Sequence, residues 1–370
     1  MIYRAIGVMS GSSLDGLDIA FAEFQENAGQ WSYEIREADC YSYSNEWIEK
    51  LRTATSFTAL DYQLLHVEYG HYIGKQINKF ISERNLHYQV ALISSHGHTS
   101  FHVPSQKMTA QLGDGAAIAA ETQFPVVTDL RALDLAFGGQ GAPIVPIGEK
   151  WLLGDYNYFL NLGGIANISF KAEPYIAFDV CSANRVLNML ANTAGKEYDD
   201  RGQMAEKGKI NEDLLSDLNS LDYYRQSYPK SLANDFGTNI VYSMIRDSKI
   251  EMHDALRTYV EHIVVQINNA ITNANHSITT PITPPTLPSK LLATGGGAFN
   301  DFLVQQLREE LNKLNIDVIV PEENLIKYKE AMIMAFMGVL RWRQEYNVLS
   351  SVTGAIRDSI GGALWIGQEA

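Results

Sequence analysis

One order of strand and helix patterns occurs twice in this sequence, and this repetition constrains the fold more than any other feature. Apolar runs at 2–9 and 17–24 predict two strands joined by a turn rich in Gly and Ser, and a third strand is expected near 31–41. Apolar residues at helical spacing over 60–84 then predict a helix, and the run at 90–94 predicts a buried strand. The first half therefore has the pattern of a small α/β unit.

The second half repeats this pattern. Strand patterns at 158–162 and 165–170 lie on either side of a two-glycine turn, and 176–179 predicts a third strand. Helical patterns follow at 183–194 and 254–275. Because the halves share this order without obvious residue identity, we expect two α/β domains with mixed sheets that arose by an old duplication.

The boundary between the two domains is expected at a glycine-rich segment near the middle of the chain. Gly138-Gly139-Gln140-Gly141 gives the backbone freedom that a hinge requires, so we place the lobes at 1–140 and 141–370. A length of 370 residues fits two domains. The proline-rich segment 276–290 cannot join helix or sheet ladders, so it is expected to be a surface excursion without chemistry.

Charge and cysteine content exclude several classes of protein. The formal net charge of −14 would repel nucleic acid and anionic membrane, although backbone N–H groups and a divalent cation can still hold a small anion. Two cysteines are too few for a disulfide framework, which fits a reducing cytoplasm. The longest apolar run, 331–340, is about half of the ~20 residues that spanning a membrane requires. We therefore expect a cytoplasmic protein without a nucleic-acid or membrane partner.

Three turns rich in Gly and Ser follow predicted strands, at 11–16, 163–167 and 295–300. Glycines let backbone N–H groups approach a phosphate, so the three turns together predict a split nucleotide site. The alternative for each single turn is a purely steric role at the end of a strand. None of them is a P-loop, because no Gly-Lys pair is followed by Ser or Thr, and Asn300 stands where a dinucleotide fingerprint needs its third glycine.

Several charged side chains stand next to these strands. Asp15, Asp18 and Asp179 could take a proton from a hydroxyl group or hold Mg²⁺ with the phosphates, and capping of the following segment is the structural alternative. Arg131 has the planar fork that binds a carboxylate or sugar hydroxyls, or it forms a surface ion pair. Glu330 opens an apolar helix, where it could simply offset the helix dipole.

A histidine cluster supports a different class of protein. His96, His98 and His102 have a spacing compatible with a zinc hydrolase site. The remaining histidines do not supply the further ligands that such a site needs.

The motifs themselves resemble those of a known family, the anhydro-N-acetylmuramic acid kinases. Residues 9–18 match the opening signature of that family, Met-Ser-Gly-Thr-Ser-x-Asp-Gly-x-Asp, except that Ser12 replaces Thr. Seven further blocks follow in the family order, at 95–97, 111–113, 129–131, 138–143, 161–167, 294–298 and 351–355. The resemblance therefore spans nearly the whole chain.

This resemblance implies a two-lobed actin/hexokinase-like, ribonuclease H-like α/β fold with a nucleotide cleft between the lobes, and a homodimer. It also implies an enzyme that opens the 1,6-anhydro ring of a muramic sugar with water and phosphorylates the released 6-hydroxyl with ATP and Mg²⁺. Asp179 would activate the water, and Asp15 and Asp18 would hold the Mg²⁺. The sugar would be contacted by His96, Arg131, Asn184 and Glu330. The nucleotide would be bound by Gly11, Ser12, Ser13, Leu14, Asp15, Gly16, Leu17, Asp18, Gly163, Gly164, Asn167, Gly295, Gly296 and Gly297.

The sequence departs from the family pattern beside the expected catalytic aspartate. Val180-Cys181-Ser182-Ala183 stands where the family has Thr-Gly-Pro-Gly, and His98 replaces a usual Gln. Losing the glycines and the proline changes backbone freedom at this place. Two alternatives therefore remain at this stage: a kinase for another anhydro- or amino-sugar, and a weakly active nucleotide- or sugar-binding sensor.

Overall fold

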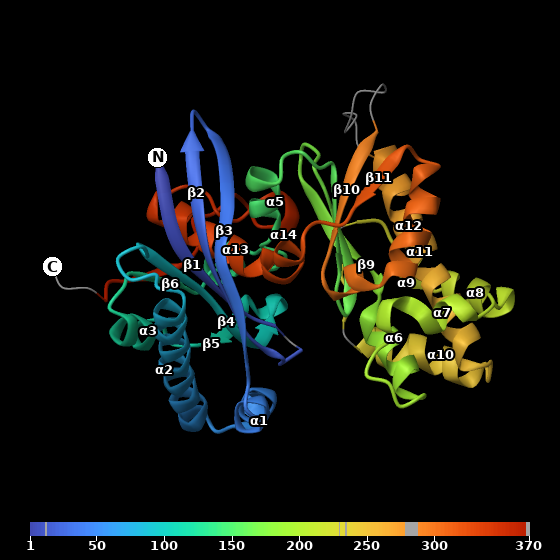
Figure 1. The fold of residues 1–370 in the computed structure, drawn as a ribbon, viewed down its shortest axis with the longest axis horizontal. Helices are drawn as coiled ribbons and strands as arrows, with labels where there is room; N and C mark the ends of the chain where they lie inside the picture. The colour runs from blue at the N-terminus through green and yellow to red at the C-terminus, as the bar shows by residue number, and fades with distance from the viewer. Residues whose placement is uncertain (12, 229, 234, 278–287, 368–370) are drawn as a thin grey trace. The chain divides into compact units, whose positions relative to one another are not determined.

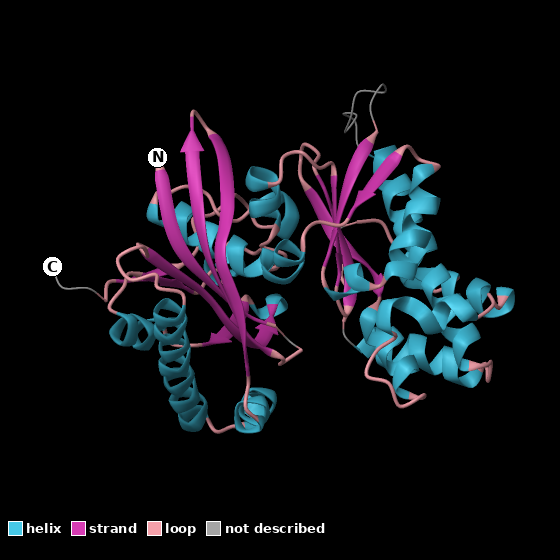
Figure 2. Cartoon of the chain, viewed as in Figure 1, coloured by secondary structure: helices cyan, strands magenta, loops and turns pink. Residues whose placement is uncertain are grey.

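The computed structural model describes residues 1–11, 13–228, 230–233, 235–277 and 288–367. The chain forms two compact units, which we call unit 1 (Met1–Leu153 and Tyr328–Ala370) and unit 2 (Gly154–Lys327). Figure 1 follows the chain from its N-terminus, in blue, to its C-terminus, in red, and Figure 2 distinguishes helices from strands. In the part of the chain that is described, no helix combines the length and the apolar character that crossing a membrane requires.

The sheet of unit 1 has the order β12-β6-β4-β1-β2-β3, and β5 pairs with β4. Three antiparallel strands come first in the chain, and β4 and β6 then run parallel to β1. The strands are β1 (Ile2–Ser10), β2 (Gly16–Asn27), β3 (Gln30–Ser42), β4 (Leu92–Val103), β5 (Met108–Leu112), β6 (Val126–Thr128) and β12 (Ala363–Trp365).

Helices cover the two faces of this sheet with different sets of residues. Ile6 and Val8 of β1 join one buried cluster with Ile73 and Phe80 of α2, whose N-terminus is capped by the Thr58 hydroxyl. Side chains alternate along a strand, so Gly7 faces the other side, where α13 approaches it. The helices of unit 1 are α1 (Asn45–Thr53), α2 (Ala59–Glu83), α3 (Gly115–Thr122), α4 (Ala132–Ala136), α5 (Pro146–Leu152), α13 (Glu323–Trp342, which begins in unit 2) and α14 (Ser350–Thr353).

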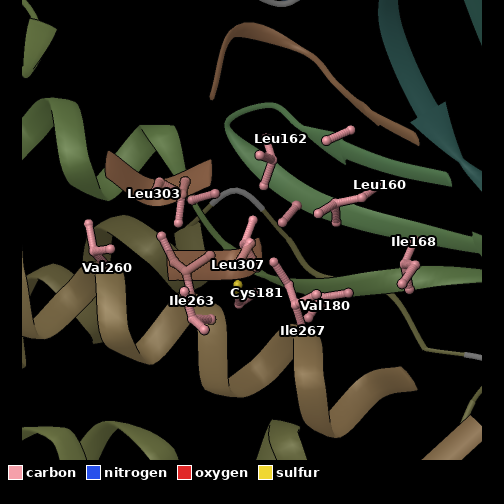
Figure 3. Packing of buried hydrophobic residues seen from close by; sticks show 14 of the residues in the cluster. Leu160, Leu162, Ile168, Val180, Cys181, Val260, Ile263, Ile267, Leu303 and Leu307 are labelled. Carbon is pink, nitrogen blue, oxygen red and sulfur yellow. The ribbon is translucent and has the colours of Figure 1, made fainter. Parts of the chain in front are cut away.

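Unit 2 contains a five-stranded sheet of the order β11-β10-β7-β8-β9. Its strands are β7 (Tyr158–Leu162), β8 (Ile165–Phe170), β9 (Ile176–Ser182), β10 (Ser289–Thr294) and β11 (Ile316–Ile319). Figure 3 shows Ile263 and Ile267 of α11 packed with Leu303 and Leu307 of α12 and with Cys181 of the sheet in one buried cluster. The helices are α6 (Asn184–Asn192), α7 (Gln203–Lys207), α8 (Glu212–Asn219), α9 (Asp222–Arg225), α10 (Tyr242–Asp247), α11 (Met252–Ser277) and α12 (Asp301–Asn312).

The two sheets share one topology. Strands β7, β8 and β9 are antiparallel neighbours like β1, β2 and β3, and β10 and β11 continue in parallel like β4 and β6. A long helix precedes the fourth strand in both cases, α2 before β4 and α11 before β10. The duplicated α/β fold with mixed sheets of the ribonuclease H-like, actin/hexokinase-like type is therefore confirmed.

The units differ in extent from the lobes expected at 1–140 and 141–370. The chain leaves unit 1 after Leu153 and returns to it at Tyr328, so residues 141–153 and 328–370 join unit 1. Helix α5 contacts β3, and α13 packs on β1, which places both in the core of the first sheet. The Gly138–Gly141 segment expected as the hinge is bonded inside unit 1, because the Gly141 N–H donates to the Asp134 carboxylate. Most of the proline-rich segment expected at 276–290 lies outside the described residues.

We expect Gly7→Ala to destabilise unit 1. A Cβ atom at residue 7 would lie 1.8 Å from the carbonyl oxygen of Ala331 and 2.6 Å from the amide nitrogen of Ala335, so β1 and α13 would have to separate. Such overpacking costs about 1–3 kcal/mol of the free energy of unfolding, which urea denaturation measures. The matched control is Gly154→Ala, whose Cβ would meet only the flexible Lys171 ammonium group at 3.6 Å. Equal stability of Gly7→Ala and the wild type would contradict the close approach.

Candidate active site

The turn between β1 and β2 is fixed by backbone contacts. The Leu14 N–H lies 3.5 Å from the Gly11 carbonyl oxygen, and Leu14 adopts a φ of 61°. Gly16 is buried, and a Cβ there would lie 2.7 Å from the Cys40 sulfur atom. Ser13 and Asp15 are exposed, whereas Ser12 lies outside the described residues. The turn thus presents polar groups to solvent on a constrained backbone.

A buried hydrogen-bond network lies at the start of this turn. The Tyr43 hydroxyl donates to the Ser10 Oγ at 2.8 Å and lies 2.6 Å from the Tyr69 hydroxyl. The Ser10 Oγ also lies 3.0 Å from Nδ1 of His98. Tyr43 and Tyr69 could not be predicted from the sequence, because neither stands in a motif and both come close to Ser10 only in the folded chain.

The Asp18 carboxylate on β2 interacts electrostatically with two other carboxylates of unit 1. Burial raises the pKa of Asp18 to about 6, a hydrogen bond with the Cys40 thiol lowers it, and the negative charges of Glu330 and Asp15 raise it. Asp18 and Cys40 are directly opposed in the register of β2 and β3. The structure thus brings together three of the predicted residues, Asp15, Asp18 and Glu330, and adds Cys40.

These carboxylates fit a magnesium ion that is shared with phosphates. Mg²⁺ commonly takes one or two carboxylates and completes its shell with water and substrate oxygens. The neighbouring negative charges that raise the pKa of Asp18 are those that a cation would offset. No group of three or more His, Cys, Asp or Glu side chains suited to a metal ion occurs among the described residues.

Arg131 is held against β4 by two hydrogen bonds. Its Nε donates to Nε2 of His96 at 2.8 Å, and its Nη1 donates to the Gly141 carbonyl at 2.6 Å. Burial lowers the pKa of Arg131 to about 10, while the charges of Glu330 and Asp134 raise it. Arg131 therefore remains a cation at neutral pH, within the electrostatic influence of Glu330 and Asp134. The surface ion pair considered for Arg131 is not formed.

The Gly138–Gly141 segment is held in place by Asp134, which is fully buried. Its carboxylate accepts hydrogen bonds from the Gly141 N–H at 2.8 Å and from the Thr353 hydroxyl at 2.7 Å. The Gln140 N–H donates to the Thr353 carbonyl at 2.8 Å. These contacts bring the blocks at 138–143 and 351–355 together, although they lie more than 200 positions apart in the chain.

The histidine cluster does not form a zinc site. Nδ1 of His96 lies 2.9 Å from the Gly97 carbonyl, to which it must donate, and Nε2 accepts from Arg131. Both ring nitrogens of His96 are thus occupied, and His98 Nδ1 is bonded to Ser10. Burial lowers the pKa of His96 to about 3, and the charge of Arg131 adds to this effect. The ring is therefore neutral and serves to orient Arg131.

In unit 2, Asp179 lies on β9, directly opposite Asn167 of β8. Its Oδ2 accepts a hydrogen bond from the Leu232 N–H at 2.9 Å. Its backbone carbonyl accepts from the Tyr223 hydroxyl at 2.6 Å. Burial raises the pKa of Asp179, and the Leu232 hydrogen bond lowers it. The capping role considered for Asp179 is not seen, since Ala183 rather than Asp179 precedes α6.

The second and third glycine turns meet at Asn184. The Asn184 N–H donates to the Gly163 carbonyl at 3.1 Å, and its side-chain amide donates to the Leu162 carbonyl at 2.8 Å. A Cβ at Gly297 would lie 2.9 Å from the Asn184 Oδ1, and Gly295 adopts a φ of 79°. The structure thus unites in unit 2 Gly163, Gly164, Gly295, Gly296, Gly297 and Asn184.

The unusual segment between Asp179 and Asn184 is anchored without glycine or proline. Cys181 is buried among apolar side chains, and burial raises the pKa of its thiol. The Ser182 carbonyl accepts from the Tyr259 hydroxyl at 2.8 Å, and the Ala183 N–H donates to the Gly164 carbonyl at 2.8 Å. The altered residues therefore support β9 and the start of α6, so that Asp179 and Asn184 keep defined positions.

We expect His96→Gln to make unit 1 less sensitive to acid. The folded-state pKa of His96, about 3, lies below the ordinary value of 6.5, so unfolding takes up a proton between these values. The resulting contribution to stability is present at pH 7 and is lost as the pH falls. The drop in the free energy of unfolding between pH 7 and pH 5, measured by urea denaturation, should be about 2 kcal/mol smaller in the variant. The exposed His87→Gln serves as control, and an unchanged drop in His96→Gln would contradict the buried neutral ring.

Comparisons with known proteins identify the family of this chain. The family model of the anhydro-N-acetylmuramic acid kinases matches residues 3–367. Relatives with that name are 31% identical in Clostridioides difficile, over 95% of this chain and 95% of the relative, and 31% identical in Haemophilus influenzae, over 95% and 94%. Another, from Sulfurovum sp., is 29% identical over 98% of this chain and 99% of the relative.

Among solved structures, the chain is similar to the activator of the 2-hydroxyisocaproyl-CoA dehydratase from Clostridium difficile with bound ADPNP. The TM-score is 0.44 at 11% identity, over 92% of this chain and 96% of that chain. The family model, by contrast, covers nearly every residue and includes all the motifs described above. This chain belongs to the anhydro-N-acetylmuramic acid kinase family.

Proposed function

We propose that this protein is an ATP-dependent phosphotransferase that opens 1,6-anhydro-N-acetylmuramic acid with water and phosphorylates the released 6-hydroxyl, giving N-acetylmuramic acid 6-phosphate. Membership of the kinase family over residues 3–367 carries the proposal. The conformation of Asp179 supports it, because this carboxylate is partly buried and is held by a hydrogen bond to Oδ2.

Asp179 is proposed as the base that activates the water. The Leu232 N–H occupies Oδ2, and Oδ1 accepts no hydrogen bond within the described part of the chain, so it can receive a proton. Burial raises the pKa of Asp179, which brings it nearer to the pH at which a base works best. As water attacks the anomeric carbon, its proton passes to Asp179 and the bond to the bridging oxygen breaks. That oxygen then attacks the γ-phosphorus, and ADP leaves.

Arg131, His96, Glu330 and Asn184 are proposed to contact the sugar. His96 keeps Arg131 in one orientation, and Arg131 stays charged at neutral pH. A fixed guanidinium group can bind a carboxylate or a pair of hydroxyls through two parallel hydrogen bonds. Muramic acid carries both kinds of group.

The residues at 11–18, with the turns containing Gly163, Gly164, Asn167 and Gly295–Gly297, are proposed to bind ATP. Asp15 and Asp18 are proposed to hold Mg²⁺, which when bound offsets charge on the phosphates. The constrained turn after β1 and the two glycine turns that meet in unit 2 support this assignment.

A cytoplasmic homodimer is proposed as well. Cys40 and Cys181 are both free thiols, as a reducing compartment would keep them. The dimer follows from the resemblance of the sequence to the family, and light scattering of the purified protein measures it.

We expect Asp179→Asn to abolish most turnover while nucleotide binding persists. A positioned base contributes roughly 10²- to 10⁴-fold, and Asn is close in size to Asp, so its amide oxygen can still accept from the Leu232 N–H. Phosphate transfer from labelled ATP to 1,6-anhydro-N-acetylmuramic acid measures the loss, and calorimetry with ATP measures binding.

The matched control for this experiment is Asp155→Asn, at an exposed position of unit 2. Its transfer rate should equal that of the wild type. Near-normal turnover of Asp179→Asn would refute the assigned base. A wild-type protein that binds ATP but phosphorylates no anhydro-sugar would refute the proposed function.

A further inference from the structure

Arg185 lies beside the glycine turn of unit 2, in the first turn of α6. Its backbone N–H donates to the Gly164 carbonyl at 3.4 Å. A Cβ built on Gly164 would lie 3.8 Å from the Nε of Arg185 and 3.9 Å from its Nη2. The guanidinium group therefore extends along the Gly163–Gly164 turn, and the preceding residue, Asn184, contacts the third glycine turn.

Arg185 has no partner in the part of the chain that the structure describes. Its Nε is buried and makes no hydrogen bond, and neither an ion pair nor a ring contact involves its side chain. The other arginines each have such a contact: Arg4, Arg36, Arg52, Arg84, Arg131, Arg201, Arg225, Arg246, Arg257, Arg308, Arg341, Arg343 and Arg357. Arg185 is therefore an exception in a chain with 43 acidic residues.

An unpaired buried donor has an energetic cost that a ligand can remove. Leaving a buried donor without an acceptor is unfavourable, and more so for a charged group. The described part of the chain supplies no carboxylate to Arg185, so an outside acceptor would be bound without displacing a partner seen in the structure. The planar guanidinium fork matches the oxygens of a phosphate or carboxylate group.

The backbone of Gly164 and Gly296 is open on the side where a Cβ would stand, whereas a Cβ on Gly163 would lie 3.3 Å from the Ile165 carbonyl oxygen. A Cβ on Gly164 would meet nothing nearer than the Arg185 atoms, and one on Gly296 would meet only the Asn184 amide at 3.6 Å. Close backbone approach at a glycine turn is how phosphate groups are commonly bound in proteins. A phosphate seated at Gly163 and Gly164 would lie within reach of the Arg185 fork.

We propose that Arg185 is a phosphate-binding residue of this enzyme, which holds an oxygen of the ATP phosphates at the Gly163–Gly164 turn. This inference rests on the proposed function for the identity of the anion. Two observations support the inference: Arg185 has no partner among the described residues, and its guanidinium group lies beside the Gly163–Gly164 turn. The carboxylate of the sugar has the same chemistry, and the experiment separates the two sources.

The test compares Arg185→Gln and Arg185→Lys with the wild type, and Arg225→Gln is the control, because Arg225 forms only an exposed ion pair with Asp222. Calorimetry measures ATP and tripolyphosphate binding, and the transfer assay measures KM for the sugar. Loss of a charge-assisted hydrogen bond should weaken ATP and tripolyphosphate binding by about 10- to 100-fold in Arg185→Gln. Arg185→Lys keeps the charge without the fork and should lose less. The melting temperature of Arg185→Gln should not fall, because no native contact is removed.

Each outcome decides the inference. Wild-type affinity for ATP in Arg185→Gln would overturn it, and so would a raised KM for the sugar with unchanged ATP binding, which would assign Arg185 to the sugar carboxylate. A lowered melting temperature with unchanged phosphate affinity would show a purely structural role. If the wild type transfers no phosphate to the sugar but loses tripolyphosphate binding on Arg185→Gln, the proposed function fails while the inference stands. If the wild type binds neither ATP nor tripolyphosphate, both fail.

Discussion

The register of the antiparallel strands is the constraint on which the candidate residues of each unit depend. In unit 1 it places Asp18 opposite Cys40, and in unit 2 it places Asp179 opposite Asn167. Side chains alternate between the faces of a sheet, so a slip of one residue would turn either aspartate to the opposite face. A bulge lies next to Asp179, between the pairs formed by Ala166 and Asn167. Bulges of this kind re-aim a side chain at the end of a strand.

Within unit 1, buried polar groups are arranged so that each one fixes another. The Asp134 carboxylate holds Gly141 and Thr353, and the Gly141 carbonyl in turn accepts from Arg131. His96, neutral because it is buried, accepts from the same guanidinium group. A buried polar group that loses its partner is costly, so this chain of contacts favours a single conformation of Arg131. The cationic group of Arg131, which interacts electrostatically with Glu330, is thus fixed before any ligand binds.

In unit 2, the candidate residues are held in position mainly by backbone hydrogen bonds and close backbone contacts. The carbonyls of Gly163 and Gly164 accept from the first N–H groups of α6, and Gly295 and Gly297 allow the third turn to approach Leu162. Close approach requires glycine at positions 295 and 297, and the φ of 79° at Gly295 adds to this requirement. Arg185 is the one charged side chain placed against this backbone surface without a partner among the described residues.

Much of the fold and part of the site could be predicted, because the relevant signals are local. Periodicity located the strands around 2–24 and 158–179 and the helix at 60–84, and the three glycine turns stood in the motifs that also indicated the family. The assigned roles of Asp179, Arg131 and Glu330 come from that resemblance and stay predictions. The zinc alternative was open in the sequence, since only the folded chain shows that Arg131 and Gly97 occupy both nitrogens of His96.

The sequence by itself determined the order of the elements, the duplication and the family, since apolar spacing and short motifs are properties of neighbouring residues. The tertiary structure decided what depends on residues far apart in the chain. Thr353 meets Asp134 across 219 positions, residues 328–370 return to unit 1, and Arg185 has no carboxylate partner among the residues that the structure describes. Such pairings depend on which surfaces pack together in the cores, and a local sequence pattern does not determine which surfaces these are.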